Sequence, residues 1–282
     1  MTPPLRPLSL DQLTVIGARP AELVDLAANA GFAAVSPWLG AVRYDGLPAA
    51  HLRAGDPETV AMARRLRETG VVINHADGFA LSDATPMAAY REGVPLMAEM
   101  GARNIVALQF DNDEARGFDQ FCQLAEWAAT AGMGIVLEFT PLSRIANLDD
   151  ALAFLARAGQ ANAGLLVDLL HLAQSGGTPA DLARVPPGLI RGAQLCDGPA
   201  SVDHATYAHN AITHRLWPGE GDLLVAAFLN ALPPDIIIGV EIPRDEPTPD
   251  LPARTAEAMR RSARALAYAA RSDHGRDDLA AH

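Results

Sequence analysis

The sequence predicts an α/β protein that folds as a single (β/α)8 TIM barrel, and three observations support this fold class. Short apolar runs rich in Val, Ile and Leu alternate with longer amphipathic stretches, which is the pattern of βα units around a parallel sheet. Eight such units can be counted, and eight is the number that closes a barrel. No GxGxxG motif follows the first predicted strand, whereas a doubly wound nucleotide-binding sheet usually has one.

Each predicted strand is an apolar run, and each predicted helix is the amphipathic stretch that follows it. The expected strands lie at 13–17, 33–38, 71–75, 104–109, 134–139, 164–170, 190–196 and 235–242. The expected helices lie at 20–30, 57–69, 86–100, 114–131, 148–158, 179–183, 222–231 and 251–271. Several helices begin with Pro in the first turn and stop just before Gly, as at Gly31 and Gly70. One barrel domain is therefore expected over 1–272, followed by a polar, flexible tail at 273–282.

Composition limits the partners and the compartment. The 282 residues carry a net charge of −12, and Lys and Arg form no basic block, which argues against nucleic acid as a partner. Cys122 and Cys196 have no CxxC spacing, so neither a disulfide framework nor a thiolate zinc site is expected. No signal core and no apolar run of bilayer length is found. We expect a soluble cytoplasmic protein that contacts no membrane and binds a small molecule.

Polar side chains close four consecutive predicted strands in the second half of the chain. These residues are Glu138, Asp168, Gln194 and Glu241. Carboxyl ends of barrel strands share one mouth, and a carboxylate buried beside Val and Ile is costly unless something pairs with it. A shared cation is the interpretation that explains all four, and oxygen ligands favour Mn²⁺, Mg²⁺ or Co²⁺ over zinc. The alternative for each acid is a strand-end cap or an ion pair with an Arg of the barrel rim.

The stretches VLEFTP, LLVDLLHLAQSGG, GAQLCDGP, RLWPGEGD and IGVEIP resemble the xylose isomerase-like TIM barrels of the sugar phosphate isomerases and epimerases. The resemblance implies that Glu138, Asp168, Gln194 and Glu241 hold one divalent metal ion. It also implies that His171 and Arg215 contact the substrate, and that the barrels pair into homodimers or homotetramers. Many members of the family have His where this chain has Gln194. A Gln at this position resembles the hydroxypyruvate isomerase and inosose dehydratase branches, but it does not by itself choose between these two activities.

Metal and carboxylates together suggest a mechanism. A divalent ion can polarise the carbonyl of an α-hydroxyketone and stabilise the enediolate left after proton removal. Glu138 and Glu241 are the expected acid and base, with His171 as a further catalytic residue. Three carboxylates around one divalent ion leave a negative site, which favours a neutral keto-sugar or a polyol-derived ketone. The predicted function is therefore a metal-dependent sugar isomerase or epimerase of carbohydrate metabolism.

Other residues are candidates for substrate binding. The segment 197–222 is longer than a usual βα connection, so a lid or binding element is expected there. It contains Arg215 and Glu220, which are expected to contact substrate, although a mutual salt bridge is the plainer explanation. Trp38 and His75 are placed at the ends of the second and third predicted strands and are expected to face the same pocket. Core packing is the alternative for both.

Three other functions fit parts of the pattern. A lyase on the same scaffold, such as a dehydratase of an inosose or a dehydroshikimate-like ring ketone or an eliminase of oxidised glycosides, shares the same first step. An apurinic endonuclease would need about three metals, further His ligands and a basic rim, which this acidic chain lacks. A barrel that only binds a sugar or a protein would not require the complete set of acids.

Overall fold

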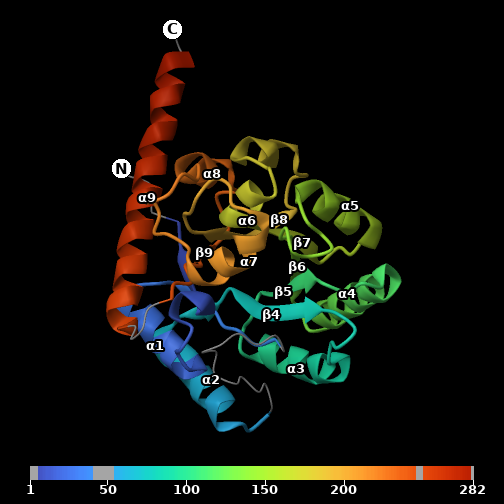
Figure 1. The fold of residues 1–282 in the computed structure, drawn as a ribbon. Coiled ribbons are helices and arrows are strands. Elements are labelled where there is room, and N and C mark those ends of the chain that lie inside the picture. The colour runs from blue at the N-terminus through green and yellow to red at the C-terminus, as the bar shows by residue number, and fades with distance from the viewer. Residues whose placement is uncertain (1–5, 41–53, 246–249, 281–282) are drawn as a thin grey trace.

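The computed structural model describes residues 6–40, 54–245 and 250–280, without the side chains of His204 and of residues 273–280. Its centre is a nearly closed barrel of nine parallel strands in the order β3-β2-β1-β9-β8-β7-β6-β5-β4 (Figure 1). The strands are β1 Leu8–Asp11, β2 Ala34–Ser36, β3 Val72–Ile73, β4 His75–Leu81, β5 Asn104–Gln109, β6 Gly134–Glu138, β7 Ala163–Asp168, β8 Ile190–Leu195 and β9 Ile238–Val240. The predicted TIM barrel fold is confirmed.

Nine strands arise from eight predicted ones because the third barrel strand is interrupted. β3 pairs with β2, whereas β4, which begins one residue after Asn74, pairs with β5. The register of β4 also shifts between Ala76 and Phe79, at a bulge that contains Gly78 with a φ of 86°. Only Gly adopts this conformation readily, so the bulge depends on the glycine. An isolated bridge between Trp38 and Asp77 continues the contact between β2 and β4 past the interruption.

Helices cover the outside of the barrel. They are α1 Pro20–Ala30, α2 Pro57–Thr69, α3 Met87–Glu99, α4 Glu114–Thr130, α5 Leu148–Ala158, α6 Leu169–Gln174, α7 His204–Thr213, α8 Val225–Ala231 and α9 Leu251–Ala280, with 3-10 turns at η1 Gln12–Val15 and η2 Pro179–Arg184. End signals agree with the sequence: Asp56 caps the first amides of α2, and Gly70 ends that helix in the left-handed region. α9 runs along the barrel and projects beyond it (Figure 1). None of the described helices is long and apolar enough to cross a bilayer.

The core has two parts. The larger lies between the barrel wall and the helices, and the smaller lies inside the barrel, where Val106, Val136 and Leu166 pack together with Leu108 at their edge. The inner cluster forms an apolar floor below the β5 to β7 side of the mouth, while the buried ring of His75 lies elsewhere inside the barrel. Side chains of alternate strand residues point inward, which carries Glu138 and Asp168, each two residues beyond a member of this cluster, to the surface of the floor.

Several predicted elements need correction. The first strand is not at 13–17: β1 is Leu8–Asp11, and 12–15 form the turn η1. A parallel ladder with β2 and β9 fixes β1 there, and Ser9 and Asp11 alternate with Leu8 and Leu10, which hid the strand from a search for apolar runs. α6 and α7 were not predicted. α9 continues as a helix to Ala280, beyond the expected domain end at 272.

Candidate active site

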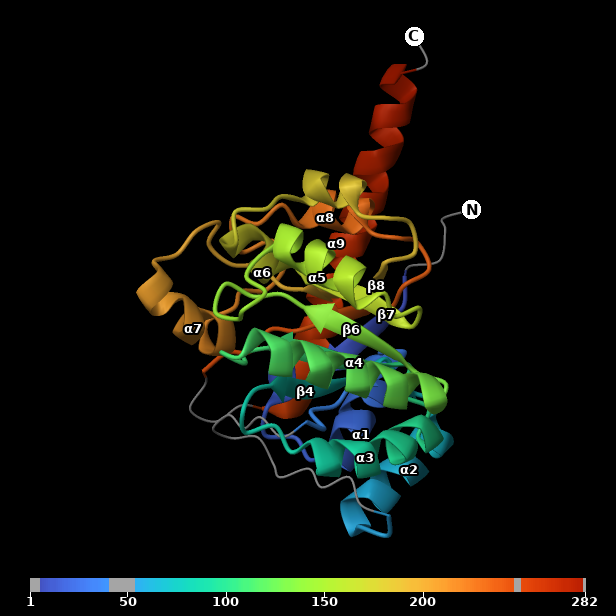
Figure 2. The same ribbon diagram turned by 90° about the vertical axis from the view of Figure 1, so that its right-hand side faces the viewer.

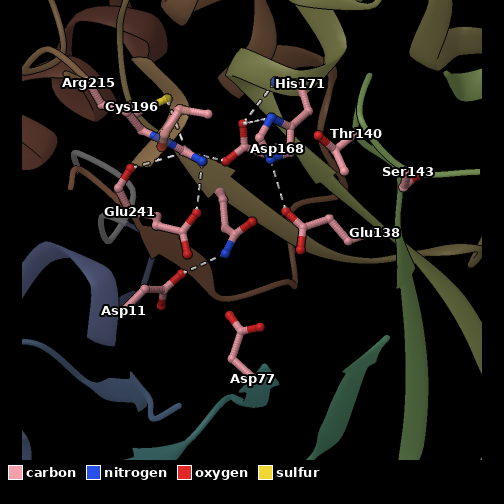
Figure 3. Close-up of polar contacts among 12 residues, drawn as sticks. Asp11, Asp77, Glu138, Thr140, Ser143, Asp168, His171, Cys196, Arg215 and Glu241 are labelled. Carbon is pink, nitrogen blue, oxygen red and sulfur yellow. Dashed lines mark hydrogen bonds and ion pairs between the residues drawn. The ribbon is translucent and has the colours of Figure 1, made fainter. Parts of the chain in front are cut away.

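Four predicted ligands lie together at the barrel mouth, and Figure 3 shows three of them, Glu138, Asp168 and Glu241, pointing into one site. Glu138 ends β6, Asp168 ends β7, Gln194 lies near the end of β8, and Glu241 follows β9 directly. Asp168 and Gln194 are paired neighbours in the ladder between β7 and β8. All four side chains are buried, none with more than 5% exposure. The fold therefore brings these side chains into one polar site above the apolar floor.

Arg215 binds two of these acids. Its Nη1 donates to Asp168 Oδ2 at 2.5 Å, and its Nη2 lies 3.1 Å from Glu241 Oε2. The backbone explains this placement, because the Arg215 amide donates to the carbonyl of Pro243 and so pins the segment after α7 beside the segment after β9. The guanidinium is itself only 3% exposed. The salt bridge between Arg215 and Glu220, which was the alternative to substrate contact, does not form: Arg215 pairs with Asp168 and Glu241, and Glu220 with Arg244 and Arg261.

His171 belongs to the same cluster through the geometry of α6. Asp168 is the N-cap of α6 and accepts the His171 amide at 3.0 Å, so the imidazole stands on the first turn beside the mouth. His171 Nε2 lies 3.4 Å from Glu138 Oε1, while Nδ1 forms a 2.6 Å hydrogen bond with the Tyr207 hydroxyl. That hydroxyl also lies 2.7 Å from Thr140 Oγ1. A continuous chain of polar contacts thus runs from Thr140 to Glu138.

Two further carboxylates were missed by the sequence analysis. Asp11 ends β1 and Asp77 lies on β4, and both are at least 97% buried. Asp11 accepts hydrogen bonds from Ser9 and Gln194. Within the described chain the side-chain carboxylate of Asp77 accepts only from the amide of Gly78, and no cation pairs with it there. Figure 3 shows both side chains pointing towards the other acids.

Protonation follows from burial and from neighbouring charges. Burial, reinforced by Asp168, raises the pKa of Glu138 to about 8. Burial also raises the pKa values of Glu241, Asp11 and Asp77 well above those of ordinary carboxyl groups. Burial opposes ionisation of Asp168 too, but Arg215 and His171 outweigh it and lower the pKa of that group. The site therefore contains more buried carboxyl groups than its single guanidinium can balance, and in the metal-free protein the unbalanced groups favour their protonated form.

The residues present fit a divalent metal ion. Gln194 Oε1 is buried and has no hydrogen-bond partner, which is unusual for a buried amide oxygen. Ligand atoms of Glu138, Asp168 and His171 lie within 4.8 Å of one another. This grouping differs from the predicted set by including His171. An all-oxygen or mixed oxygen and imidazole site suits Mn²⁺, Mg²⁺, Co²⁺ or zinc, so a metal site is possible here while the ion stays unidentified.

The mouth opens into a small cavity of about 100 Å³. Its wall includes Glu138, His171, Arg215, Glu241 and Asp77, together with apolar side chains. α7, which lies beyond the arrowhead end of β6 (Figure 2), covers one side with Tyr207, Ala208, Ala211 and Ile212. The predicted binding role of the long segment after β8 thus has a physical basis in α7.

The other predicted substrate residues have different environments. Trp38 lines the cavity, and its indole lies so close to Gly78 that a Cβ there would come within 2.4 Å of it. His75 begins β4 rather than ending a strand, so the predicted position is wrong. It lies one inward layer below Asp77 and faces Gly192, and neither ring nitrogen has a partner. Glu220 pairs with Arg261 and Arg244, not with the cavity wall.

Comparisons with known proteins agree with this architecture. A 3-dehydroshikimate dehydratase of Pseudomonas aeruginosa is 31% identical over 141 residues, which make up 48% of this chain but only 22% of the dehydratase. The structure of an IolI protein with a bound zinc atom is 17% identical, with a TM-score of 0.71 over 94% of this chain and 98% of that one. D-allulose 3-epimerase from a Methylomonas species is 18% identical, with a TM-score of 0.70 over 94% and 100%.

The family itself is shown by a match over most of the chain. The sequence model of the xylose isomerase-like TIM barrel covers residues 24–266, which include every element from β2 to β9 and parts of α1 and α9. The resemblance seen in the sequence motifs is confirmed, and relatives in the family are enzymes, among them epimerases and a dehydratase. The chain belongs to the xylose isomerase-like TIM barrel family.

Proposed function

We propose that this protein is a divalent-metal-dependent isomerase or epimerase that removes a proton beside the carbonyl of a keto-sugar or a related α-hydroxyketone. The observation that carries the proposal is the buried group Glu138, Asp168, Gln194 and Glu241, with an amide oxygen that has no partner. These four residues would hold Mn²⁺, Mg²⁺ or Co²⁺. When bound, the ion supplies polarisation of the carbonyl and stabilises negative charge that develops on the substrate oxygens.

Glu138 and Glu241 are the proposed acid and base. They come from β6 and from the end of β9, on either side of the β7 and β8 ends. A carboxyl group with a raised pKa, as both have, is suited to exchange protons with carbon near neutral pH. Return of the proton to the other face of the same carbon gives an epimer, and return to the next carbon gives an isomer.

His171 and Arg215 would orient these groups and the substrate. His171 Nε2 faces Glu138, and burial lowers the pKa of the imidazole, so the ring is neutral and can relay a proton. Arg215 is already committed to Asp168 and Glu241, and no other Lys or Arg lines the described cavity wall. A neutral, hydroxylated substrate is therefore favoured over a sugar phosphate. Trp38 would supply an apolar wall for its carbon face.

A dehydratase is the second candidate, because the curated relative with 31% identity acts on 3-dehydroshikimate. The first step is the same proton removal. The outcome differs only if the substrate carries a hydroxyl on the β carbon, which then leaves as water with help from a general acid. The carboxyl group that removed the α proton can return it to the leaving hydroxyl, and His171, whose Nε2 lies 3.4 Å from Glu138 Oε1, can relay it.

The test is a proton-exchange screen in D₂O. Metal-free protein reloaded with Mn²⁺ or Mg²⁺ is incubated with D-allulose, an inosose, a 3-keto-glucoside and 3-dehydroshikimate, and the products are followed by NMR and mass spectrometry. We expect deuterium at one α carbon of at least one ketone, abolished by Glu138→Gln and by Glu241→Gln but retained by the control Glu220→Gln. Retained oxygen supports the isomerase or epimerase, and loss of water supports the dehydratase. Absence of exchange with every ketone contradicts both.

A further inference from the structure

We propose that Asp11 is a positioning residue, which fixes the amide of Gln194 so that its oxygen faces the metal site. This inference rests on the proposed function, because the orientation matters only if Gln194 is a metal ligand. Asp11 lies on β1, at the opposite end of the sequence from the proposed ligands, which come from the ends of β6 to β9. Its contacts give it a role that differs from ligation.

Asp11 is held in a fixed position by its neighbours. Ser9 Oγ donates to Asp11 Oδ1 at 3.1 Å, and Ser9 is linked to Ser36 on β2 by a further hydroxyl contact of 3.0 Å. All three residues have 0% exposure. On the opposite side, a Cβ at Gly239 would come within 2.2 Å of Asp11 Oδ2, so the carboxylate occupies space that only a glycine of β9 leaves open.

The second oxygen of Asp11 determines how Gln194 lies. Gln194 Nε2 donates to Asp11 Oδ2 at 3.2 Å. Both oxygens of Asp11 accept hydrogen bonds in the structure, Oδ1 from Ser9 and Oδ2 from Gln194, whereas an amide has one donor end and one acceptor end. The carboxylate therefore selects the nitrogen end, and the oxygen end is turned away from Asp11. That oxygen is the buried Oε1 that has no partner.

The reverse orientation of the Gln194 amide would be unfavourable for two reasons. An amide oxygen against Asp11 would be repelled by the carboxylate, and an NH₂ group aimed at a cation could not bind it. Ligand groups of metal sites are commonly oriented in this way by a hydrogen-bonded neighbour, and loss of that neighbour typically weakens metal binding by about 10-fold to 100-fold. A glutamine ligand needs such a device because its two ends are nearly the same size.

Two variants of Asp11 separate positioning from charge. Asp11→Asn and Asp11→Ala both remove the negative charge, but Asn can still accept from Gln194 through its oxygen while its NH₂ end donates to the Ser9 hydroxyl, and Ala cannot. Mn²⁺ affinity of the metal-free proteins is measured by calorimetry and by electron paramagnetic resonance. We expect Asp11→Ala to bind Mn²⁺ about 10-fold more weakly than Asp11→Asn. In a Gln194→Ala background, which has no amide to orient, the two variants should bind equally.

A third variant moves the carboxylate without removing it. Gly239→Ala should displace Asp11, weaken Mn²⁺ binding, and have no such effect beside Gln194→Ala; it serves as the test if Asp11→Ala fails to fold. Equal affinity of Asp11→Asn and Asp11→Ala, or a difference that persists beside Gln194→Ala, would overturn the positioning role while leaving the proposed function intact. Failure of the wild-type protein to bind Mn²⁺ would overturn both.

Discussion

The two sides of the barrel mouth treat buried negative charge differently. On the side of β7 and β9, Arg215 contacts both Asp168 and Glu241, so a guanidinium balances charge inside the protein. On the side of β1 and β4, Asp11 and Asp77 have only neutral donors, namely a hydroxyl, an amide side chain and a backbone N–H. Both sides are equally buried. The difference is therefore one of pairing, not of solvent access.

Paired and unpaired buried carboxylates are expected to affect the stability of the fold in opposite ways. A buried ion pair is costly to break, because removal of one partner leaves the other uncompensated. A buried carboxylate with no cation lowers stability on its own, and such groups are retained mainly where a ligand completes them. Arg215 thus holds Asp168 and Glu241 in fixed positions. Asp11 and Asp77, which have no cation of their own in the described chain, would gain most in stability from a positive charge bound at the mouth.

Removal of Arg215 should have the largest effect. Arg215→Met leaves two buried acids without their cation, and we expect the free energy of unfolding of the metal-free protein to fall by about 3–5 kcal/mol. Urea denaturation at pH 7 measures it. Arg19→Met is the control, because Arg19 forms an exposed pair with Glu58 and should show no measurable change. A loss for Arg215→Met as small as the control would remove the distinction between the two sides.

A matched pair of isosteric changes should move stability in opposite directions. Asp168→Asn leaves Arg215 with one partner and should lower the free energy of unfolding by about 3 kcal/mol. Asp77→Asn removes a buried acid with no cation and should raise it by about 1–3 kcal/mol. Both are measured on metal-free protein by the same denaturation. Stabilisation by Asp168→Asn, or destabilisation by Asp77→Asn, would show that pairing does not govern these groups.

The sequence could predict the paired side better than the unpaired side. Glu138, Asp168 and Glu241 follow long apolar runs, so hydrophobic period alone marks them as strand-end residues. Asp11 ends a four-residue strand in which polar residues alternate with Leu. Asp77 lies beside a bulge in a strand that is interrupted at Asn74. A Gly directly after an Asp in an otherwise apolar run, as at Gly78, was the available signal for that bulge.

Which charged side chains pair with one another cannot be predicted from a single sequence. The expectation that Arg215 would meet substrate or Glu220 considered neighbours along the chain, whereas its partners are 47 and 26 residues away. Tyr207 was missed because its contact with His171 depends on where α7 packs, and helix period does not fix that. His75 was misplaced by a single break in a strand, since a short interruption changes which strand end a residue occupies.

The pH dependence of Asp77→Asn sharpens the comparison. Burial, then Glu138 and Asp11, raise the pKa of Asp77 above its ordinary value of 3.8. The folded protein therefore holds a proton that the unfolded chain releases above pH 3.8, and this group costs stability as pH rises from there. We expect wild type and Asp77→Asn to have similar stability near pH 4. The variant should gain by up to about 1.4 kcal/mol per pH unit towards neutrality.

Denaturation of metal-free protein at several pH values measures this difference. Asp111→Asn is a useful contrast, because Arg116 lowers the pKa of Asp111, so the stability that this carboxylate contributes is lost only as pH falls below its ordinary value of 3.8 and should change little from pH 4 to pH 7. A stability difference between wild type and Asp77→Asn that stays constant from pH 4 to pH 7 would contradict an unpaired, proton-holding carboxyl group at position 77.

The smallest expected effect on stability belongs to Tyr207, which joins α7 to the acid on β6. When Thr140 donates to Tyr207 and Tyr207 donates to His171 Nδ1, the imidazole proton lies on Nε2 and faces Glu138. Tyr207→Phe removes the hydroxyl that orients His171, and we expect it to lower the free energy of unfolding by about 1 kcal/mol. Proton exchange on the ketone substrate should nevertheless slow by about 10-fold or more, since the ring is no longer held in place. Tyr268→Phe, an exposed residue of α9, is the control. Equal exchange rates for the two variants would mean that His171 is oriented by Asp168 and packing alone.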